Sequence, residues 1–451
     1  MTSLSISKRS VRNKFILFIL YMPIYLIALP YFGSQFGKLG PYLVFFTINI
    51  VSLMVVLFLW AEMPIRKYWF LFLIPLLPWG IGTLNGIRVN GSISSGDLFE
   101  IIRPFGIFIN FLLGYFLYKK YSFKENTQSL LKVLTFLIIL NFIVSVFPVL
   151  GFNEIAKFSA WFGLGVEYHA GYAGFRAFGI VGQPGVLAIF CNFCALLLYF
   201  YYIDYKSKKK NTSLIILLYL LLFFSILASG SRIGLGFWFI NFIVASVFIK
   251  KLRILLFVLV TTIILVTYVY WVELSDFVSL MSRGINLAEG TTGSLGFRLM
   301  YKVLIFDLLS NDLISFFFGI GPSKEVLQAP LRHPDSSISV YNIRYGYLGL
   351  LIYSTPILLI FYFSCTAFFK KTNSLNNSKR LFLTVSMVVQ IYFLVVGHLE
   401  PAYEDFKINV LFFYLCGFTV SLIESRNEQV NTDASQLKEP AHNYRKTKDQ
   451  K

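Results

Sequence analysis

Long apolar stretches, separated by short polar connectors, follow one another along almost the whole chain. A helix needs about 20 mostly apolar residues to cross a bilayer, because its backbone polar groups must be satisfied within the segment. Twelve stretches meet this requirement, so the pattern predicts an all-α, polytopic membrane protein with about 12 transmembrane helices. The predicted spans are residues 14–32, 41–60, 68–86, 99–118, 128–150, 178–203, 213–229, 232–249, 254–272, 345–363, 381–398 and 405–423.

Lys and Arg residues gather in every second connector and in both terminal segments. Because short cytoplasmic loops retain positive charge, this pattern places both termini in the cytoplasm. Two connectors on the opposite side are long, residues 151–177 and 273–344, whereas packed helices are usually joined by about 2 to 8 residues. We expect the second one to be functional, since it contains aromatic residues, glycine turns and a helical stretch.

The composition excludes a soluble enzyme, because hydrophobic residues make up 57% of the chain and charged residues only 14%, against about a quarter in soluble domains. A net charge of +18 would favour nucleic acid as a partner of a soluble protein. Here it mostly orients the chain in the membrane, and we expect no nucleic-acid partner. Residues 1–423 form the predicted membrane domain, and the polar residues 424–451 a solvated, disordered cytoplasmic tail.

Ionisable side chains at the outer membrane face are candidate site residues, because charge is costly in that environment. Arg103 lies inside the fourth span, three residues after Glu100, so it either pairs locally with that carboxylate or contacts a ligand. Arg344 lies at the start of the tenth span. We assign both arginines to a supporting or acceptor-binding role.

Two glycine-containing segments at the same face suit an anion. Arg176 opens residues 176–185, with three glycines and a proline, where the sixth span begins. A loosened helix start exposes backbone N–H groups beside the arginine; the alternative is a kinked helix start with a snorkelling arginine. Arg232 follows a Ser-Gly-Ser sequence in a tight turn between two spans, and its guanidinium can grip phosphate oxygens in a bidentate manner.

The long outer connector supplies the remaining candidates. Apolar residues recur at helical spacing over residues 296–318, with Arg298 near the start; this helix either lies on the membrane surface or forms a lid with a phosphate-facing edge. His333 lies close to Asp335. Histidine is well suited to take a proton near neutral pH, and a nearby Asp can orient it or serve itself. These two residues are therefore the catalytic candidates.

At these residues the chain resembles the O-antigen polymerase and O-antigen ligase superfamily of bacterial membrane glycosyltransferases. The resemblance covers most of the chain in architecture, and its motifs keep their order. They are residues 176–185, the turn at 229–234, Arg298 with the following helix and its glycine stop, and residues 333–335 before the glycines at 346 and 349. Gly185 departs from the pattern, since the family often has Asn after the proline.

The resemblance implies a GT-C-like bundle in the bacterial inner membrane, with a large periplasmic loop at about residues 273–344. It implies an inverting glycosyl transfer outside that membrane, from an undecaprenyl-diphosphate-linked sugar to a sugar hydroxyl. Arg176, Arg232 and Arg298 would bind the diphosphate, and His333 would deprotonate the acceptor. The donor already carries its activation, so neither a metal nor a cofactor is expected. Lipid-linked oligosaccharides would be donor and acceptor, with membrane lipid and a chain-length regulator as further partners.

Two other functions remain open at this point. A ligase would transfer the polymer to lipid A core, whereas a polymerase joins lipid-linked repeat units. The sequence His-Pro-Asp at residues 333–335 differs from the His-Asn or similar polar pair that ligases tend to have, and we favour the polymerase. A lipid-linked oligosaccharide flippase is the alternative from a different class, because twelve helices and buried arginines also suit lipid-diphosphate transport.

Overall fold

The structure is a computed structural model of the chain, and it describes residues 16–32, 36, 39–60, 70–93, 95–163, 176–207, 212–248, 294–322, 337–369, 377–397 and 405–438. Within these ranges every regular element is a helix. Seven of them are long and apolar enough to cross a membrane, and two shorter apolar helices, Ser213–Ser229 and Ile233–Ile243, accompany them. The predicted all-α class is confirmed, and the helices are those of a multi-pass membrane protein; the number of twelve spans stays a prediction.

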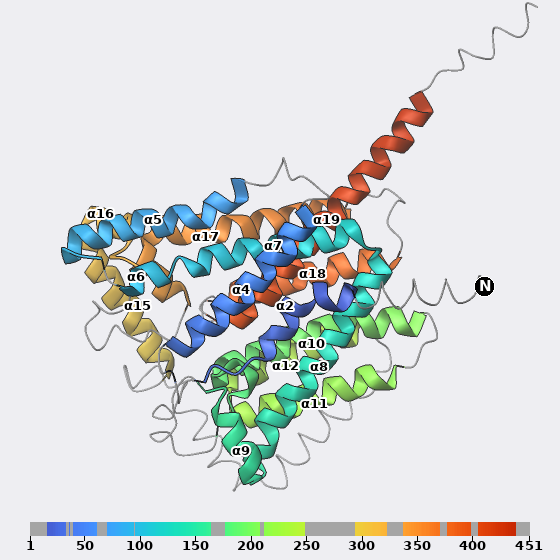
Figure 1. Cartoon of the computed structure of the whole chain (residues 1–451), viewed down its shortest axis with the longest axis horizontal. Helices are drawn as coiled ribbons and strands as arrows, with labels where there is room; N and C mark the ends of the chain where they lie inside the picture. Colours follow the sequence, from blue (N-terminus) through green and yellow to red (C-terminus); the bar gives the residue numbers. More distant parts are fainter. Residues whose placement is uncertain are drawn as a thin grey trace, which may run out of the picture.

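The helices form one bundle (Figure 1). In the first part of the chain they are α2 (Met22–Tyr25), η1 (Leu26–Ala28), α4 (Leu39–Trp60), α5 (Phe70–Asn90), α6 (Ser95–Phe99), α7 (Ile102–Lys120), α8 (Phe123–Val149) and α9 (Asn153–Ala160). They continue as η3 (Gly179–Val181), α10 (Pro184–Ser207), α11 (Ser213–Ser229), α12 (Arg232–Phe248), α15 (Ser294–Ser310), α16 (Leu313–Phe318), α17 (Ser337–Phe369), α18 (Asn377–Gly397) and α19 (Phe406–Lys438). The predicted span at 254–272 lies outside the described residues.

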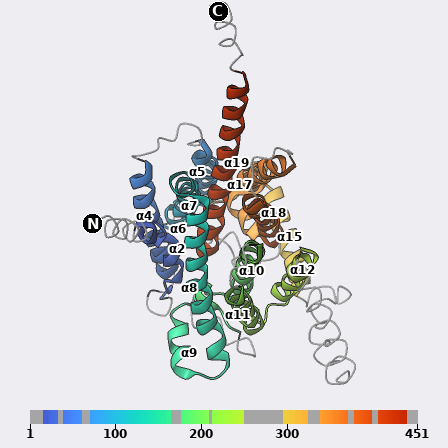
Figure 2. The ribbon, with the colours of Figure 1, turned by 90° about the vertical axis from the view of Figure 1, so that its right-hand side faces the viewer.

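Helices α7 and α19 pack closely in the middle of the bundle, with α19 between the N-terminal helices and α17 and α18 (Figure 2). Gly114 of α7 faces the carbonyl group of Tyr414, and Gly417 of α19 faces the carbonyl group of Phe111. A Cβ atom on either glycine would overlap the facing oxygen. Small residues on both helices thus allow their backbones to approach, as is common between transmembrane helices.

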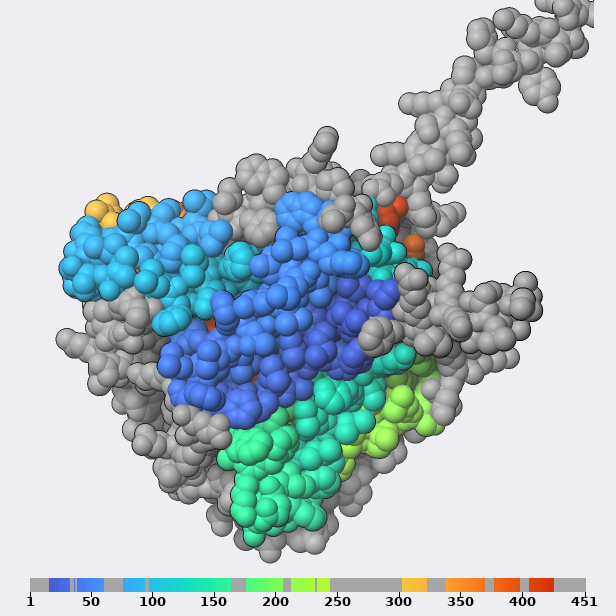
Figure 3. All heavy atoms as spheres, in the orientation of Figure 1, coloured from blue at the N-terminus to red at the C-terminus, as the bar shows by residue number. Residues whose placement is uncertain are grey.

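Helix α4 shows how the bundle meets its surroundings. Phe45 and Ile48 are buried in the core, whereas Met54 and Phe58 are 63% and 57% exposed. Figure 3 shows α4 running across the visible face of the molecule. Such an exposed apolar face suits contact with the hydrocarbon of a bilayer. The backbone also suits this environment, because the polar groups of an α-helix are hydrogen-bonded within the helix.

Several predicted helices are interrupted. The first ends at Ala28, after which the chain is extended at Leu29. The predicted helix 296–318 is divided into α15 and α16, because the Asp312 side chain accepts hydrogen bonds from the first N–H groups of α16 and caps a new helix. Helix α17 begins before the predicted start of the tenth span and breaks at Gly346, whose φ is +67°.

Helix α19 extends beyond the predicted end of the last span at residue 423. It continues to Lys438, into the segment predicted to be a solvated tail, and its C-terminal part projects beyond the other helices (Figure 1). The side chains from residue 426 onward lie outside the described part of the chain.

Candidate functional site

A buried ion cluster joins the start of α7 to α17. Glu100, between α6 and α7, accepts hydrogen bonds from Nε of Arg103 at 2.8 Å and from Nη1 of Arg344 at 3.1 Å. The Tyr42 hydroxyl of α4 donates to the same carboxylate at 2.9 Å. The three charged side chains are at most 5% exposed. Two guanidinium groups from distant segments thus meet at one carboxylate inside the bundle.

Local structure on both sides builds this cluster. Residues three apart on a helical turn share one face, which brings Arg103 to Glu100. Arg344 is fixed by backbone pairing with the segment after α16: Ile320 donates its N–H to the carbonyl of Ile343 at 2.8 Å, and Gly321 to that of Arg344 at 3.3 Å. The break in α17 follows two residues after Arg344. The described end of the long connector therefore positions one of the two arginines.

Aromatic rings line the cluster on the side of α19. The Arg103 guanidinium lies 4.4 Å from the centre of the Phe406 ring, a favourable cation–π distance. The Phe406 ring stacks on Phe45 of α4, with their centres 4.0 Å apart. This stack places the start of α19 against the arginines.

A second buried charged group, Lys407, lies next along α19 and was not predicted from the sequence. Its ammonium group donates to the carbonyl oxygens of Leu29 at 2.6 Å and Ile180 at 2.5 Å, and it lies 4.0 Å from the centre of the Tyr31 ring. Asp405 caps α19 by accepting the N–H of Ile408 at 2.8 Å. Lys407 thus ties the end of the first helical segment and η3 to α19. An ionisable residue at the edge of an apolar span was the signal available for finding it.

Arg176 contacts the turn between α11 and α12. Its Nε donates to the carbonyl of Ser229 at 3.1 Å and its Nη2 to that of Gly230 at 3.3 Å. Gly230 has a φ of +58°, and Ser231 caps α12 by accepting the N–H of Gly234 at 3.1 Å. The backbone of Arg232 follows directly. The two segments predicted to bind a diphosphate are therefore neighbours.

These groups lie at one end of the bundle, which we call the arginine end. It holds the starts of α7, α10, α12 and α19, together with α15 and α16 (Figure 1). Six segments meet there through the contacts described above: residues 29 to 31, 100 to 103, 176 to 182, 229 to 231, 344 and 405 to 407. Segments far apart in the sequence thus bring basic side chains, and the acidic Glu100 and Asp405, to one end of the bundle.

The α15–α16 pair is anchored to this end by polar residues of α5. Arg88 pairs with Asp312, Asn85 donates from Nδ2 to the carbonyl of Gly319 at 2.5 Å, and Asn90 donates to that of Ile320 at 3.2 Å. Gly319 has a φ of +74°, a conformation that favours glycine and ends α16. The contacts hold the segment that pairs with Arg344.

Substitution of Asp312 by asparagine is expected to speed amide exchange in α16 at neutral pH, because the ion pair to Arg88 is lost. Hydrogen bonds from the Ser315 hydroxyl and from Arg88 lower the pKa of Asp312 to about 2, against about 4 for a free side chain. Because the folded-state pKa is lowered, the stabilisation of α16 by the ionised Asp312 is complete above about pH 4. It is lost as the pH falls through about 2.

Amide hydrogen exchange measured by mass spectrometry checks this expectation. At each pH the exchange rate of α16 is compared with that of unstructured peptides. The difference between wild type and Asp312→Asn should shrink as the pH approaches 2. Equal exchange of α16 in the two proteins at pH 7 contradicts the anchoring role.

The structure places some of the predicted site residues, whereas the side chains of others lie outside the described part of the chain. Arg103 pairs with Glu100, which is one of the two alternatives given by the sequence, and Arg344 pairs with the same carboxylate; their supporting or acceptor-binding role stays a prediction. Arg176 lies beside the turn that precedes Arg232. The backbones of Arg232 and Arg298 lie on α12 and α15, but their side chains, like His333 and Asp335, lie outside the described residues. Their four assignments, and the diphosphate-binding role of Arg176, stay predictions.

Among the described residues, no group of three His, Cys, Asp or Glu side chains could hold a metal ion. At the arginine end Arg103, Arg344 and Lys407 are buried together with Glu100 and Asp405, whereas Arg176 is exposed. An exposed guanidinium suits the oxygens of an anion. Neither the protein-family models nor the curated proteins compared with the chain match it.

Proposed function

We propose that this protein is a bacterial membrane glycosyltransferase, a polymerase of O-antigen or a related surface polysaccharide. It joins undecaprenyl-diphosphate-linked repeat units by inverting glycosyl transfer at the outer face of the inner membrane. In this proposal the chain has twelve spans in a GT-C-like bundle, both termini are cytoplasmic, and the arginine end faces the periplasm.

The observation that carries the proposal is the gathering of basic side chains at the arginine end. Arg103 and Arg344 share Glu100, Arg176 lies on the turn before Arg232, and Lys407 ties η3 to α19. A diphosphate leaving group gains negative charge during glycosyl transfer, and pre-positioned cations at a membrane face stabilise that charge. Arginine is particularly suited because its planar guanidinium matches phosphate oxygens.

The reaction needs few protein groups. The acceptor hydroxyl oxygen attacks the anomeric carbon of the donor, the carbon–oxygen bond to the diphosphate breaks, and the lipid diphosphate leaves with the bonding electron pair. The hydroxyl proton passes to His333, oriented by Asp335. In the proposal Arg176, Arg232 and Arg298 bind the diphosphate, and the Glu100 cluster supports the acceptor side.

A strain that lacks the gene tests the proposal through a gel of its surface polysaccharide. For a polymerase, lipid A core bearing a single repeat unit should remain, and the wild-type gene should restore the ladder. Arg176→Ala should lower polymer by about a hundredfold, the usual effect of removing one donor to a developing charge. Lys157→Ala is the control, because this side chain of α9 is 74% exposed and we expect a normal ladder.

Other patterns on the gel would indicate a different function. Core that bears no repeat unit favours a ligase or a flippase, and the side of the membrane on which lipid-linked sugar accumulates distinguishes them. A full ladder from both His333→Ala and Asp335→Ala, at normal protein levels, shows that the base assignment is wrong.

A further inference from the structure

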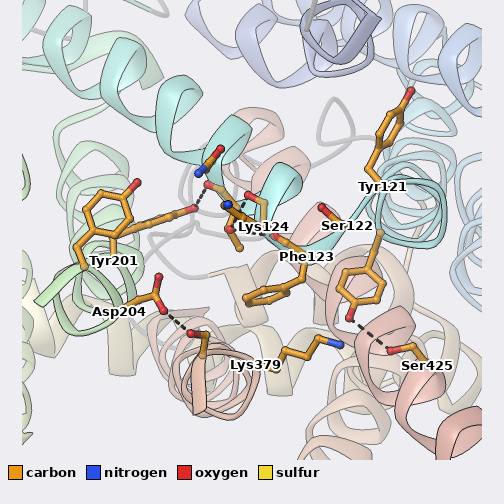
Figure 4. Close-up of a pocket in the computed structure, with 13 residues that line it drawn as sticks. Tyr121, Ser122, Phe123, Lys124, Tyr201, Asp204, Lys379 and Ser425 are labelled. Atoms are coloured by element: carbon orange, nitrogen blue, oxygen red, sulfur yellow. Dashed lines mark hydrogen bonds between the residues drawn. The ribbon is translucent and has the colours of Figure 1, made fainter. Parts of the chain in front are cut away.

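A cavity of about 670 Å³ lies at the end of the bundle opposite to the arginine end. It is formed where α7 ends, α8 begins, α10 ends and α18 begins, and Ser425 of α19 closes one side (Figure 4). Cavities that hold small ligands have volumes of about 300 to 1,000 Å³. The space is therefore sufficient for a small polar group, and it is not used by the proposed reaction.

Three charged side chains among the described residues line this cavity: Lys124 of α8, Lys379 of α18 and Asp204 of α10. Figure 4 shows the side chain of Lys379 reaching across the cavity toward Ser425. Asp204 accepts a hydrogen bond from the Ser378 hydroxyl. Two cations and one carboxylate suit a ligand that has a phosphate group and also hydroxyl donors.

Hydroxyl groups surround these charges. The Tyr118 and Ser425 hydroxyls lie 3.4 Å apart, and the Tyr201 hydroxyl donates to the carbonyl of Thr127 at 2.7 Å. Phe123 contributes an apolar wall, and its ring lies 6.1 Å from that of Phe200. The cavity thus combines polar groups with an apolar wall that belongs to the core of the bundle.

The surroundings indicate a membrane surface. Lys119 and Lys120 end α7, and Lys119 lies 3.8 Å from the Glu424 carboxylate of α19. Arg380 lies at the start of α18, with its guanidinium 5.0 Å from the centre of the Phe368 ring. Lys120 lies over the Phe58 ring at 5.0 Å. Basic residues directly beside the ends of spans attract anionic lipid, and basic pockets between spans bind its headgroups.

We propose that the cavity lined by Lys124, Lys379 and Asp204 binds the headgroup of an anionic phospholipid of the phosphatidylglycerol type. The phosphate lies between the two ammonium groups, and a glycerol hydroxyl donates to Asp204. A zwitterionic headgroup is less suited, because its own ammonium group would add a third positive charge to a cavity that has one carboxylate. Free glycerol phosphate offers the same polar groups but has no acyl chains to anchor it in the membrane.

Native mass spectrometry of the full chain, purified in detergent, tests the proposal. Phosphatidylglycerol, phosphatidylethanolamine and glycerol 3-phosphate are added separately at equal concentrations. The Lys124→Gln and Lys379→Gln double variant should bind phosphatidylglycerol about thirtyfold more weakly, the effect of losing two ammonium groups near a lipid phosphate. Lys124→Gln alone, which changes an exposed side chain, should weaken binding about fivefold.

Lys132→Gln is the matched control, because Lys132 is exposed on the same helix and does not line the cavity; its lipid binding should equal that of wild type. Thermal unfolding in the same detergent verifies that every variant is folded. Equal affinity of wild type and a folded double variant for phosphatidylglycerol overturns the proposal. Binding of glycerol 3-phosphate or phosphatidylethanolamine as strongly as phosphatidylglycerol overturns the assignment of an anionic lipid.

Discussion

Substitution of Glu100 by glutamine should destabilise the folded bundle by about 3 kcal/mol, because removal of one partner of a buried ion pair leaves the other charge without compensation. Glu100 is the shared acceptor of Arg103 and Arg344, and all three side chains are buried. The glutamine keeps the size and one oxygen acceptor, so the expected loss comes from the charge. If the protein is the proposed polymerase, polymer synthesis should fall as well, since both arginines lose their common anchor.

Unfolding of the purified protein in a denaturing detergent measures this effect, and Glu154→Gln is its matched control. Glu154 also pairs with a basic residue three positions later, Lys157, but the two side chains are 85% and 74% exposed. Exposed pairs contribute little to stability, so this variant should unfold like wild type. If Glu100→Gln also unfolds like wild type, the cluster does not hold the arginine end together.

A double-mutant cycle separates the charge effect from a change of shape. Arg344→Met should lower the free energy of unfolding less in the Glu100→Gln variant than in wild type. In the variant, residue 100 has no charge that loses a partner when Arg344 is replaced. Additive effects of the two substitutions would mean that Glu100 and Arg344 act independently.

Substitution of Gly417 by alanine is the second change with a large expected effect. The added Cβ would overlap the carbonyl oxygen of Phe111 on α7, and backbone atoms cannot move aside as a flexible side chain can. The helices must then separate, with loss of packing along both. We expect destabilisation of about 3 kcal/mol, at the upper part of the range for overpacked cores.

The same unfolding measurement, together with the amount of protein in the membrane, checks this expectation. Gly236→Ala on α12 is the control, because its new Cβ would meet no atom of another helix within 4 Å. That variant should be as stable as wild type or slightly more stable, since alanine favours a helix. Wild-type stability of Gly417→Ala would show that α7 and α19 do not pack as closely as described.

Helix positions could largely be predicted from the sequence, because an apolar run long enough to cross a bilayer is a local property of the chain. The local pair of Glu100 and Arg103 was predictable for a similar reason, since residues three apart on a helix lie on one face. The interruption at Asp312 also has a local signal, an aspartate before an apolar run, but the prediction of one continuous helix missed it. Local chemistry therefore accounts for the elements and for some of their ends.

The assembly of the site depends on contacts that no local pattern contains. Arg344 reaches Glu100 across 244 residues of sequence, and Lys407 reaches Ile180 across 227. Hydropathy identifies which segments are apolar but not which face of each meets which neighbour, because lipid and protein interior are both apolar. The sequence by itself determined an all-helical membrane chain with candidate cations at the ends of its spans. Tertiary packing alone decided which of those cations meet, since close approach of backbones, as at Gly114 and Gly417, selects the helix partners.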